Sequence, residues 1–157
     1  MSVQAIPTGY ESPIPYLVIR DAARAIEFYK ELFDATEAVR MSSPDGSAVM
    51  HAELKIRNCI LMLGEENLQR GMPSPLASAQ PPPVSVMLYV PDVDAVFARA
   101  VRMGAKALMP VTDMFWGDRF GKFADPFGHH WAVATHKEDL SPEECGRRAA
   151  EAMKHGC

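Results

Sequence analysis

Hydrophobic and polar residues along the first half of the chain follow a pattern that predicts strands around one helix. Residues 12–19 read SPIPYLVI and predict a strand whose two prolines confine it to an edge or to its first residues. Asp21 is a helix N-cap, and apolar residues then recur at helical spacing as one buried stripe: Ala22, Ala25, Ile26, Tyr29, Leu32 and Phe33. Residues 37–41, 48–56 and 59–63 predict three more strands, so this half reads β-α-β-β-β.

The same order of elements returns in the second half of the chain. Residues 84–90 predict a strand, Asp92 caps a second helix, and Gly104 ends that helix as a left-handed C-cap. The second helix carries an apolar stripe at spacings of three and four: Val93, Val96, Phe97, Ala100 and Val101. Three strands follow, at residues 106–111, 119–124 and 129–135. The chain is therefore predicted to be a duplicated β-α-β-β-β unit.

Changes in composition divide the chain into segments. The proline-rich residues 65–83 form a linker or an ordered loop between a first module at 12–64 and a second module at 84–136. In the tail, residues 137–157, Ser141 and Glu144 form a capping box that predicts a short helix. The predicted fold class is α+β: tandem βαβββ modules whose open sheets pair into one curved, cup-like mixed sheet, with a short C-terminal helix.

Composition and charge exclude several classes of protein. The 157 residues are 48% hydrophobic and 23% charged, which is typical of a soluble globular protein. A net charge of −4 gives no basic surface for nucleic acid, and no apolar run approaches the roughly 20 residues that span a membrane. The N-terminus MSVQAIPTGYESPIP has no signal-peptide pattern, so the expected location is cytoplasmic. Cys59, Cys145 and Cys157 are far apart and lack CxxC spacing, which argues against a disulfide framework or a zinc site.

The most unusual chemistry lies in one stretch, residues 109–133, which reads MPVTDMFWGDRFGKFADPFGHHWAV. The turn signal Asp125-Pro126-Phe127-Gly128 predicts a hairpin. On its first strand, side-chain alternation places Arg119, Gly121 and Phe123 on one face and Phe120, Lys122 and Ala124 on the other. On its second strand, His130, Ala132 and Ala134 oppose His129, Trp131 and Val133. The hairpin therefore has an apolar layer and a polar, aromatic-edged layer, which suits the wall of a ligand site.

Several segments carry a resemblance to a known superfamily. The segments are VIRDAARAIEFYKELFDA, HAELKIRNCILML, VMLYVPDVDAVFARAVRMGA and MFWGDRFGKFADPFGHHWAVATH. Together they resemble the vicinal oxygen chelate superfamily, which includes glyoxalase I, bleomycin-resistance proteins, extradiol dioxygenases and fosfomycin-resistance enzymes. The resemblance covers about residues 12–136, and the run FWGDRFGKFADPFGHHW is similar to the PhnB-like branch. It implies paired modules, a ligand cup and a soluble homodimer.

The resemblance also implies a divalent metal, held by His or Glu on the first and last strand of each module. Those positions fall on Ile14, Met62, Ser85 and Ala132, none of which is a usual ligand. No cofactor is therefore expected at the usual position. An alternative is a displaced divalent-metal site built from His51, Glu53 and His130, whose side chains have suitable donor atoms.

The candidate ligand-binding residues come from both halves of the chain: His51, Glu53, Phe115, Trp116, Arg119, Lys122 and His130. Their aromatic rings could stack a planar ligand while the cationic side chains pair with its carboxylate or phosphate. Structural roles remain open for each of them. His51 could be a hydrogen-bonded strand histidine and Glu53 a cross-strand partner of a Lys or Arg. Trp116 could fill the core or a dimer interface, Arg119 could form an exposed ion pair with Asp118, and His136 is predicted to be an ordinary surface histidine.

Three functions are consistent with these residues. The first is a metal-free protein of the bleomycin-resistance type that binds a small planar or anionic molecule in a cup. The second is a metal-dependent lyase, isomerase or oxygenase that uses the displaced His/Glu site. The third is an assembly or regulatory module without a small ligand. Whether the protein is an enzyme stays open, because no GxSxG motif and no ordered Ser/His/Asp set is present. A homodimer is expected, since two open sheets leave exposed edges.

Overall fold

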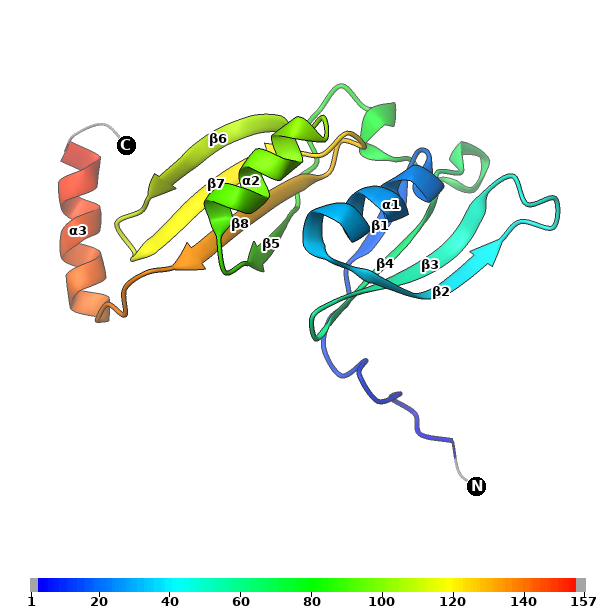
Figure 1. Ribbon diagram of the computed structural model, residues 1–157, viewed down its shortest axis with the longest axis horizontal. Coiled ribbons are helices and arrows are strands. Elements are labelled where there is room, and N and C mark those ends of the chain that lie inside the picture. Colours follow the sequence, from blue (N-terminus) through cyan, green and yellow to red (C-terminus); the bar gives the residue numbers. More distant parts are fainter. Residues whose placement is uncertain (1–2, 155–157) are drawn as a thin grey trace. The chain divides into compact units, whose positions relative to one another are not determined.

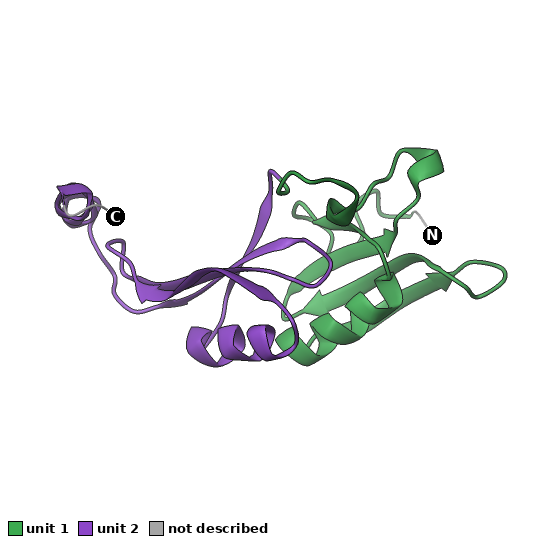
Figure 2. Cartoon of the chain, turned by 90° about the horizontal axis from the view of Figure 1, so that it is seen from above, with its two compact units in different colours: residues 1–82 green, residues 83–157 purple. Residues whose placement is uncertain are grey.

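The chain consists of two compact units, residues 1–82 and 83–157, and the computed structural model describes residues 3–154 (Figures 1 and 2). Each unit contains one four-stranded mixed sheet with one α-helix against it. A third α-helix follows the second sheet. The predicted α+β class, with two βαβββ modules and a C-terminal helix, is confirmed. Within residues 3–154, every helix is too short or too polar to cross a bilayer.

The first unit has the sheet order β1-β4-β3-β2. Its elements are β1 (Tyr16–Ile19), α1 (Ala22–Phe33), β2 (Thr36–Ser42), β3 (Val49–Ile56) and β4 (Cys59–Glu65). Strand β1 runs parallel to β4, and the other pairs are antiparallel. The strand predicted for residues 12–19 begins only at Tyr16, because Pro13 and Pro15 have no N–H to give to a neighbouring strand.

Helix α1 is fixed to the sheet at its first turn. Asp21 is the N-cap, as predicted, and its side chain accepts a hydrogen bond from the N–H of Arg24. The carboxylate of Glu65, at the end of β4, accepts from the N–H groups of Asp21 and Ala22 at 2.7 and 3.0 Å. A negative group at this helix end is also favoured by the helix dipole. The helix then covers one face of the sheet, where Ile19, Leu54 and other apolar side chains are buried.

Between the two sheets, the chain is an ordered loop rather than a free linker. It forms two short 3₁₀ turns, Leu68–Arg70 and Pro75–Ala77. The Glu66 carboxylate accepts hydrogen bonds from the N–H and the hydroxyl of Ser74, at 2.8 and 2.6 Å, and from Arg20 at 2.8 Å. These contacts fold the first part of the loop back onto the start of α1.

The second unit repeats the order, with the sheet order β5-β8-β7-β6. Its elements are β5 (Ser85–Tyr89), α2 (Val93–Arg102), β6 (Lys106–Asp113), β7 (Asp118–Ala124) and β8 (His130–His136). Helix α2 places the Phe97 ring edge-on against Phe123, with 6.1 Å between ring centroids. A Cβ on the neighbouring Gly121 would lie only 3.0 Å from the Phe97 ring, so the glycine allows this close approach of helix and sheet.

The predicted turn at residues 125–128 joins β7 to β8. The Asp125 carboxylate is buried and accepts hydrogen bonds from the N–H groups of Phe127 and His129 and from the indole of Trp131, each at 2.9 Å. Trp131 is 1% exposed and belongs to the core of the second unit. Because the indole N–H has a partner, the ring can be buried without an unsatisfied donor.

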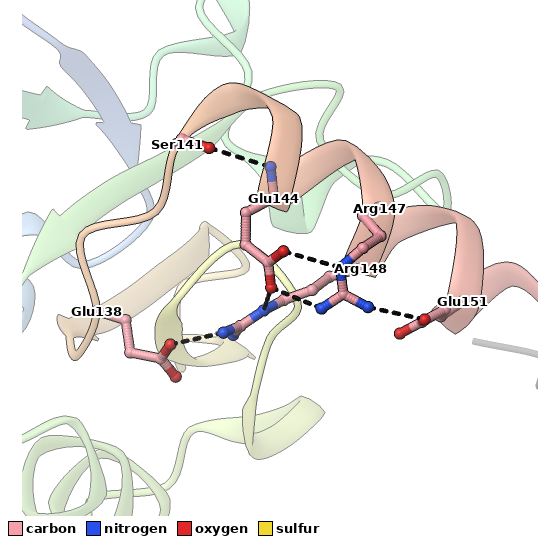
Figure 3. Close-up of polar contacts among 6 residues, drawn as sticks. All are labelled: Glu138, Ser141, Glu144, Arg147, Arg148 and Glu151. Atoms are coloured by element: carbon pink, nitrogen blue, oxygen red, sulfur yellow. Dashed lines mark hydrogen bonds and ion pairs between the residues drawn. The ribbon is translucent and has the colours of Figure 1, made fainter.

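Helix α3 (Pro142–Lys154) follows β8 and holds no fully buried side chain. Ser141 caps it by accepting a hydrogen bond from the N–H of Glu144, as predicted (Figure 3). Glu144 pairs with Arg147 and Arg148, Arg147 also pairs with Glu151, and Arg148 reaches Glu138 ahead of the helix (Figure 3). Exposed pairs of this kind contribute roughly 0.3–0.5 kcal/mol each. The helix is thus supported mainly by contacts along its own surface.

We predict that Gly117→Ala strongly destabilises the second unit. Gly117 lies in the turn before β7 with φ +94°, and a Cβ there would lie 2.5 Å from the carbonyl oxygen of Glu138. The left-handed backbone alone costs roughly 1–3 kcal/mol for a residue with a side chain, and the clash adds to that cost. The matched control is Gly46→Ala, which has φ +72° but open space around it. In urea unfolding, Gly117→Ala should lose clearly more stability than Gly46→Ala; equal losses would contradict the clash.

Candidate functional site

The face of the second sheet opposite α2 is covered by no helix of its own unit and carries most of the predicted ligand-binding residues. The strand register places Ala132 between Met87 on β5 and Lys122 on β7. It likewise places Ala134 between Tyr89 and Phe120. Directly paired residues share one face of a sheet. The two alanines therefore lie in the middle of this face, where they are buried with Phe120, and Met109, Met114 and Trp116 pack against them.

Aromatic and sulfur-containing side chains form one end of the open face. The ring of Trp116 packs edge-on against Phe120 at 5.6 Å and against Phe115 at 4.9 Å. Met109 and Met114 pack on the same cluster with Phe120 and the two alanines. Trp116 is half-buried and lies on the open face, not under α2. A flat ligand could therefore stack beside it.

Lys122 supplies the positive charge of this face. Its ammonium nitrogen lies 6.0 Å from the centroid of the Phe120 ring, at the limit of a cation–π contact. Among residues 3–154, no Asp or Glu forms an ion pair with it; each of the ion pairs found there uses another cation. His130, half-buried, lies on the same face, paired with Ala124 on β7 and Ser85 on β5.

Arg119 lies on the other face, beside α2. Its guanidinium makes a bidentate pair with Asp94 of α2, with both N–O distances at 2.7 Å, and a third bond to Asp113 at 3.1 Å. The alternative of an Arg119 pair with Asp118 is therefore wrong. Arg119 holds α2 to the sheet, and it is separated from Trp116 and Lys122, with which the sequence analysis grouped it.

Asp118 and His136 form a polar cluster at the end of β7. The Asp118 carboxylate is buried and accepts hydrogen bonds from Tyr89 at 2.7 Å and Trp116 at 3.0 Å, and it contacts His136 Nδ1 at 2.8 Å. Burial pushes the pKa of Asp118 upward, but these three contacts outweigh burial and leave the pKa below its usual value. The other His136 nitrogen lies 3.0 Å from Asp139. His136 lies at the surface, as predicted, with a side chain that is 52% exposed, but it also has two carboxylate partners that the sequence did not indicate.

His51 and Glu53 lie together on the open face of the first sheet, as their spacing on β3 predicted. His51 Nε2 is 3.2 Å from Glu53 Oε1. His51 is thus a hydrogen-bonded strand histidine, which was its structural alternative, and Glu53 has a histidine partner instead of a Lys or Arg. Two tyrosines that sequence reasoning missed complete this cluster. Tyr10 donates its hydroxyl to Glu53, and the Tyr16 hydroxyl is 3.4 Å from His51 Nδ1. Alternation along β1 could have indicated the open-face position of Tyr16, but nothing in the sequence points to Tyr10.

The residues at the expected metal positions do not fit a divalent ion. Ile14 and Ala132 have no donor atom, and neither a thioether at Met62 nor a hydroxyl at Ser85 suits a hard cation or a catalytic zinc. Within residues 3–154, no group of three or more His, Cys, Asp or Glu side chains could hold a metal ion. Cys59 and Cys145 are free thiols, and Cys157 lies outside the described residues.

A tandem βαβββ chain with an open face on each sheet defines a recognisable class of protein. The family model of the glyoxalase/bleomycin resistance protein/dioxygenase superfamily matches residues 14–133, and the chain belongs to this superfamily. An uncharacterized protein of Mycobacterium bovis is 42% identical over 132 residues, which are 83% of this chain and 86% of that protein.

Two solved structures share the fold. The PhnB protein from Bacillus cereus has a TM-score of 0.62 and 19% identity, over 80% of this chain and 99% of that one. The fosfomycin resistance protein FosX from Listeria monocytogenes, solved with Mn(II) and sulfate, has a TM-score of 0.60 and 16% identity, over 85% and 93%. At these identities the similarity shows the fold alone.

We predict that His136 makes the stability of the second unit depend on pH. Asp118 and Asp139 raise the pKa of His136 above its ordinary value of 6.5. The protonated form is therefore favoured by folding, and its contribution is fully present below pH 6.5 and lost as pH rises through the raised pKa. Thermal unfolding should show a larger fall in Tm between about pH 6 and pH 9 for the natural protein than for His136→Gln. Parallel curves would contradict the contacts of His136.

Proposed function

We propose that the second unit binds a small planar anion on the open face of its sheet, without a resident metal ion. The observation that carries this proposal is Lys122. Within residues 3–154 its ammonium group has no carboxylate partner, and it lies across from Ala132 and 6.0 Å from the centroid of the Phe120 ring. A half-buried charge without a partner is costly, and an anionic ligand would offset that cost.

The surroundings of Lys122 define the shape of the ligand. Ala132 and Ala134 are buried in the middle of the face, while Met87 and Tyr89 on the β5 side are 42% and 50% exposed. Trp116 and Tyr89 lie near each other, because both donate to the same oxygen of Asp118. A flat ring could pack against these aromatic side chains. Phe115 would extend the aromatic end, and His130 would offer a further hydrogen-bond donor or acceptor.

The open faces also lead us to propose that the protein is a homodimer, as its superfamily resemblance implied. Strand β2 is exposed along its whole length, with Val39 and Met41 among its side chains. An edge strand of this kind is usually protected by a partner.

We predict that Lys122→Ala weakens the binding of a planar carboxylate at least tenfold, because a charged hydrogen-bond partner contributes roughly 1.5–3 kcal/mol. The probe is 2-naphthoate, and its neutral analogue 2-naphthamide reports on stacking alone. Isothermal titration calorimetry of the metal-stripped protein should show a loss for naphthoate but little change for naphthamide. The same titration after addition of Mn²⁺ or Zn²⁺ should give an unchanged affinity.

The matched control is Arg119→Ala, which removes one positive charge from the same strand but from the helix face. It should leave naphthoate binding nearly unchanged while lowering stability through the loss of Asp94 contacts. The proposal fails if naphthoate does not bind, or if the two variants lose affinity equally. Binding that appears only with added metal would favour the metal-dependent alternative instead.

We predict that light scattering will give a mass of about twice 17.3 kDa at micromolar concentration. Replacing Met41 on β2 by Lys should shift the mass toward that of one chain if β2 lies in the interface. Lys154→Glu, at the end of α3, is a control for a charge change on an exposed side chain. A mass of one chain for the natural protein would contradict the dimer.

A further inference from the structure

Tyr16 lies across its sheet in a position that only a glycine permits. Strand β1 is paired with β4, and β4 with β3, so the Tyr16 ring has to pass over β4 to reach His51 on β3. It passes over Gly64, where a Cβ would lie 2.8 Å from the Tyr16 hydroxyl oxygen and 2.7 Å from the Met50 carbonyl oxygen. The ring then stacks beside the imidazole of His51, with 5.8 Å between centroids and 27° between planes.

The hydrogen bonds of this cluster assign a role to each nitrogen of His51. Glu53 is largely buried and already accepts a hydrogen bond from Tyr10. It acts as an acceptor, and its pKa is lowered by that bond and by the contact with His51. The proton of a neutral His51 is therefore on Nε2, toward Glu53, which leaves Nδ1 as an acceptor for the Tyr16 hydroxyl. A hydroxyl, a histidine base and an orienting carboxylate in series are the arrangement that activates a nucleophile.

We propose that Tyr16, His51 and Glu53 form a nucleophilic site, separate from the anion site of the second unit, that takes a small ester. Tyr16 is the nucleophile, His51 the base, and Glu53 the positioning residue. The side chains that pair directly with them across the sheet are apolar: Met62 beside Tyr16 and Glu53, Val39 opposite Glu53, and Met41 opposite His51. They fit an uncharged ester with an apolar or aryl group better than a charged one.

The reaction balances with water as the co-substrate. The Tyr16 hydroxyl gives its proton to His51 Nδ1 as its oxygen attacks the ester carbonyl carbon. The bond to the leaving alcohol or phenol breaks, and the proton on His51 goes to that leaving group. A water molecule then gives a proton to His51 and attacks the acyl-tyrosine. The carboxylic acid leaves, and the proton returns from His51 to the Tyr16 oxygen.

The other tyrosines of the chain provide internal comparisons. Tyr10 and Tyr89 donate their hydroxyl groups to Glu53 and Asp118, and each contact with a carboxylate raises the pKa of the phenol. Tyr29 is fully buried. Tyr16 is 44% exposed. Among the hydrogen bonds found in residues 3–154, only the hydroxyl of Tyr16, of the four tyrosines, contacts a histidine nitrogen. The proposal therefore predicts selective reaction at Tyr16.

The test uses p-nitrophenyl acetate with the full-length protein near neutral pH. Absorbance follows the release of p-nitrophenolate, and tandem mass spectrometry of quenched samples locates the acetyl group. We expect acetylation at Tyr16 well ahead of Tyr10 and Tyr89, although Tyr89 is similarly exposed. Tyr16→Phe should abolish the fast release. His51→Gln should slow acetylation of Tyr16 about a hundredfold, the lower range for the loss of a general base.

The control variant is His136→Gln, which removes a histidine from the other unit and should leave Tyr16 acetylation unchanged. The extent of acetylation at surface lysines shows whether each sample received the same effective dose of reagent. Circular dichroism shows whether each variant is folded. The proposal is overturned if Tyr16 reacts no faster than Tyr10 and Tyr89, or if His51→Gln leaves its rate unchanged. Naphthoate binding by the Tyr16→Phe variant should stay intact, so failure here does not bear on the anion site.

Discussion

Successive residues of a strand point to opposite faces, and in each unit of this protein only one face is covered by a helix. This constraint decides which polar groups can act together. On β7, Arg119 points toward α2 and pairs with Asp94, whereas Lys122, three residues later, points to the open face and has no carboxylate partner in the part of the chain that the structure describes. On β3, the two-residue spacing of His51 and Glu53 brings both to the open face. The same alternation thus separates structural ion pairs from groups that remain accessible to a ligand.

Each unit has a carboxylate on the open face of its sheet, Glu53 in the first and Asp118 in the second, but the hydrogen-bond partners of the two carboxylates differ. Glu53 accepts from Tyr10 and lies against His51, whose second nitrogen faces Tyr16. Asp118 is satisfied by three partners at once and has no exposed phenol at the far side of its histidine, which contacts Asp139 instead. A duplicated module has therefore diverged into one cluster that ends at an exposed hydroxyl and one that is closed on itself.

Local signals in the sequence were sufficient to predict most of the helices, strands and turns of the fold. The caps at Asp21, Asp92 and Ser141 and the turn at residues 125–128 depend on contacts within a few residues, so they could be predicted without knowledge of strand order. The site was harder because its partners are distant in sequence. Alternation already separated Arg119 from Lys122, but the side taken by α2 could not be predicted from spacing. The contact of Tyr16 with His51 requires the order β1-β4-β3, which no local pattern specifies.

The absence of a side chain at Gly64 has a consequence for how this chain can vary among its relatives. Any larger residue there would occupy the space of the Tyr16 hydroxyl and press on the backbone of β3. A lineage that acquires such a residue has to give up the tyrosine at position 16 or shift the strand, so the two positions are expected to change together. In a relative, the residues at positions 16 and 64 should together indicate whether the cluster around His51 is retained or lost.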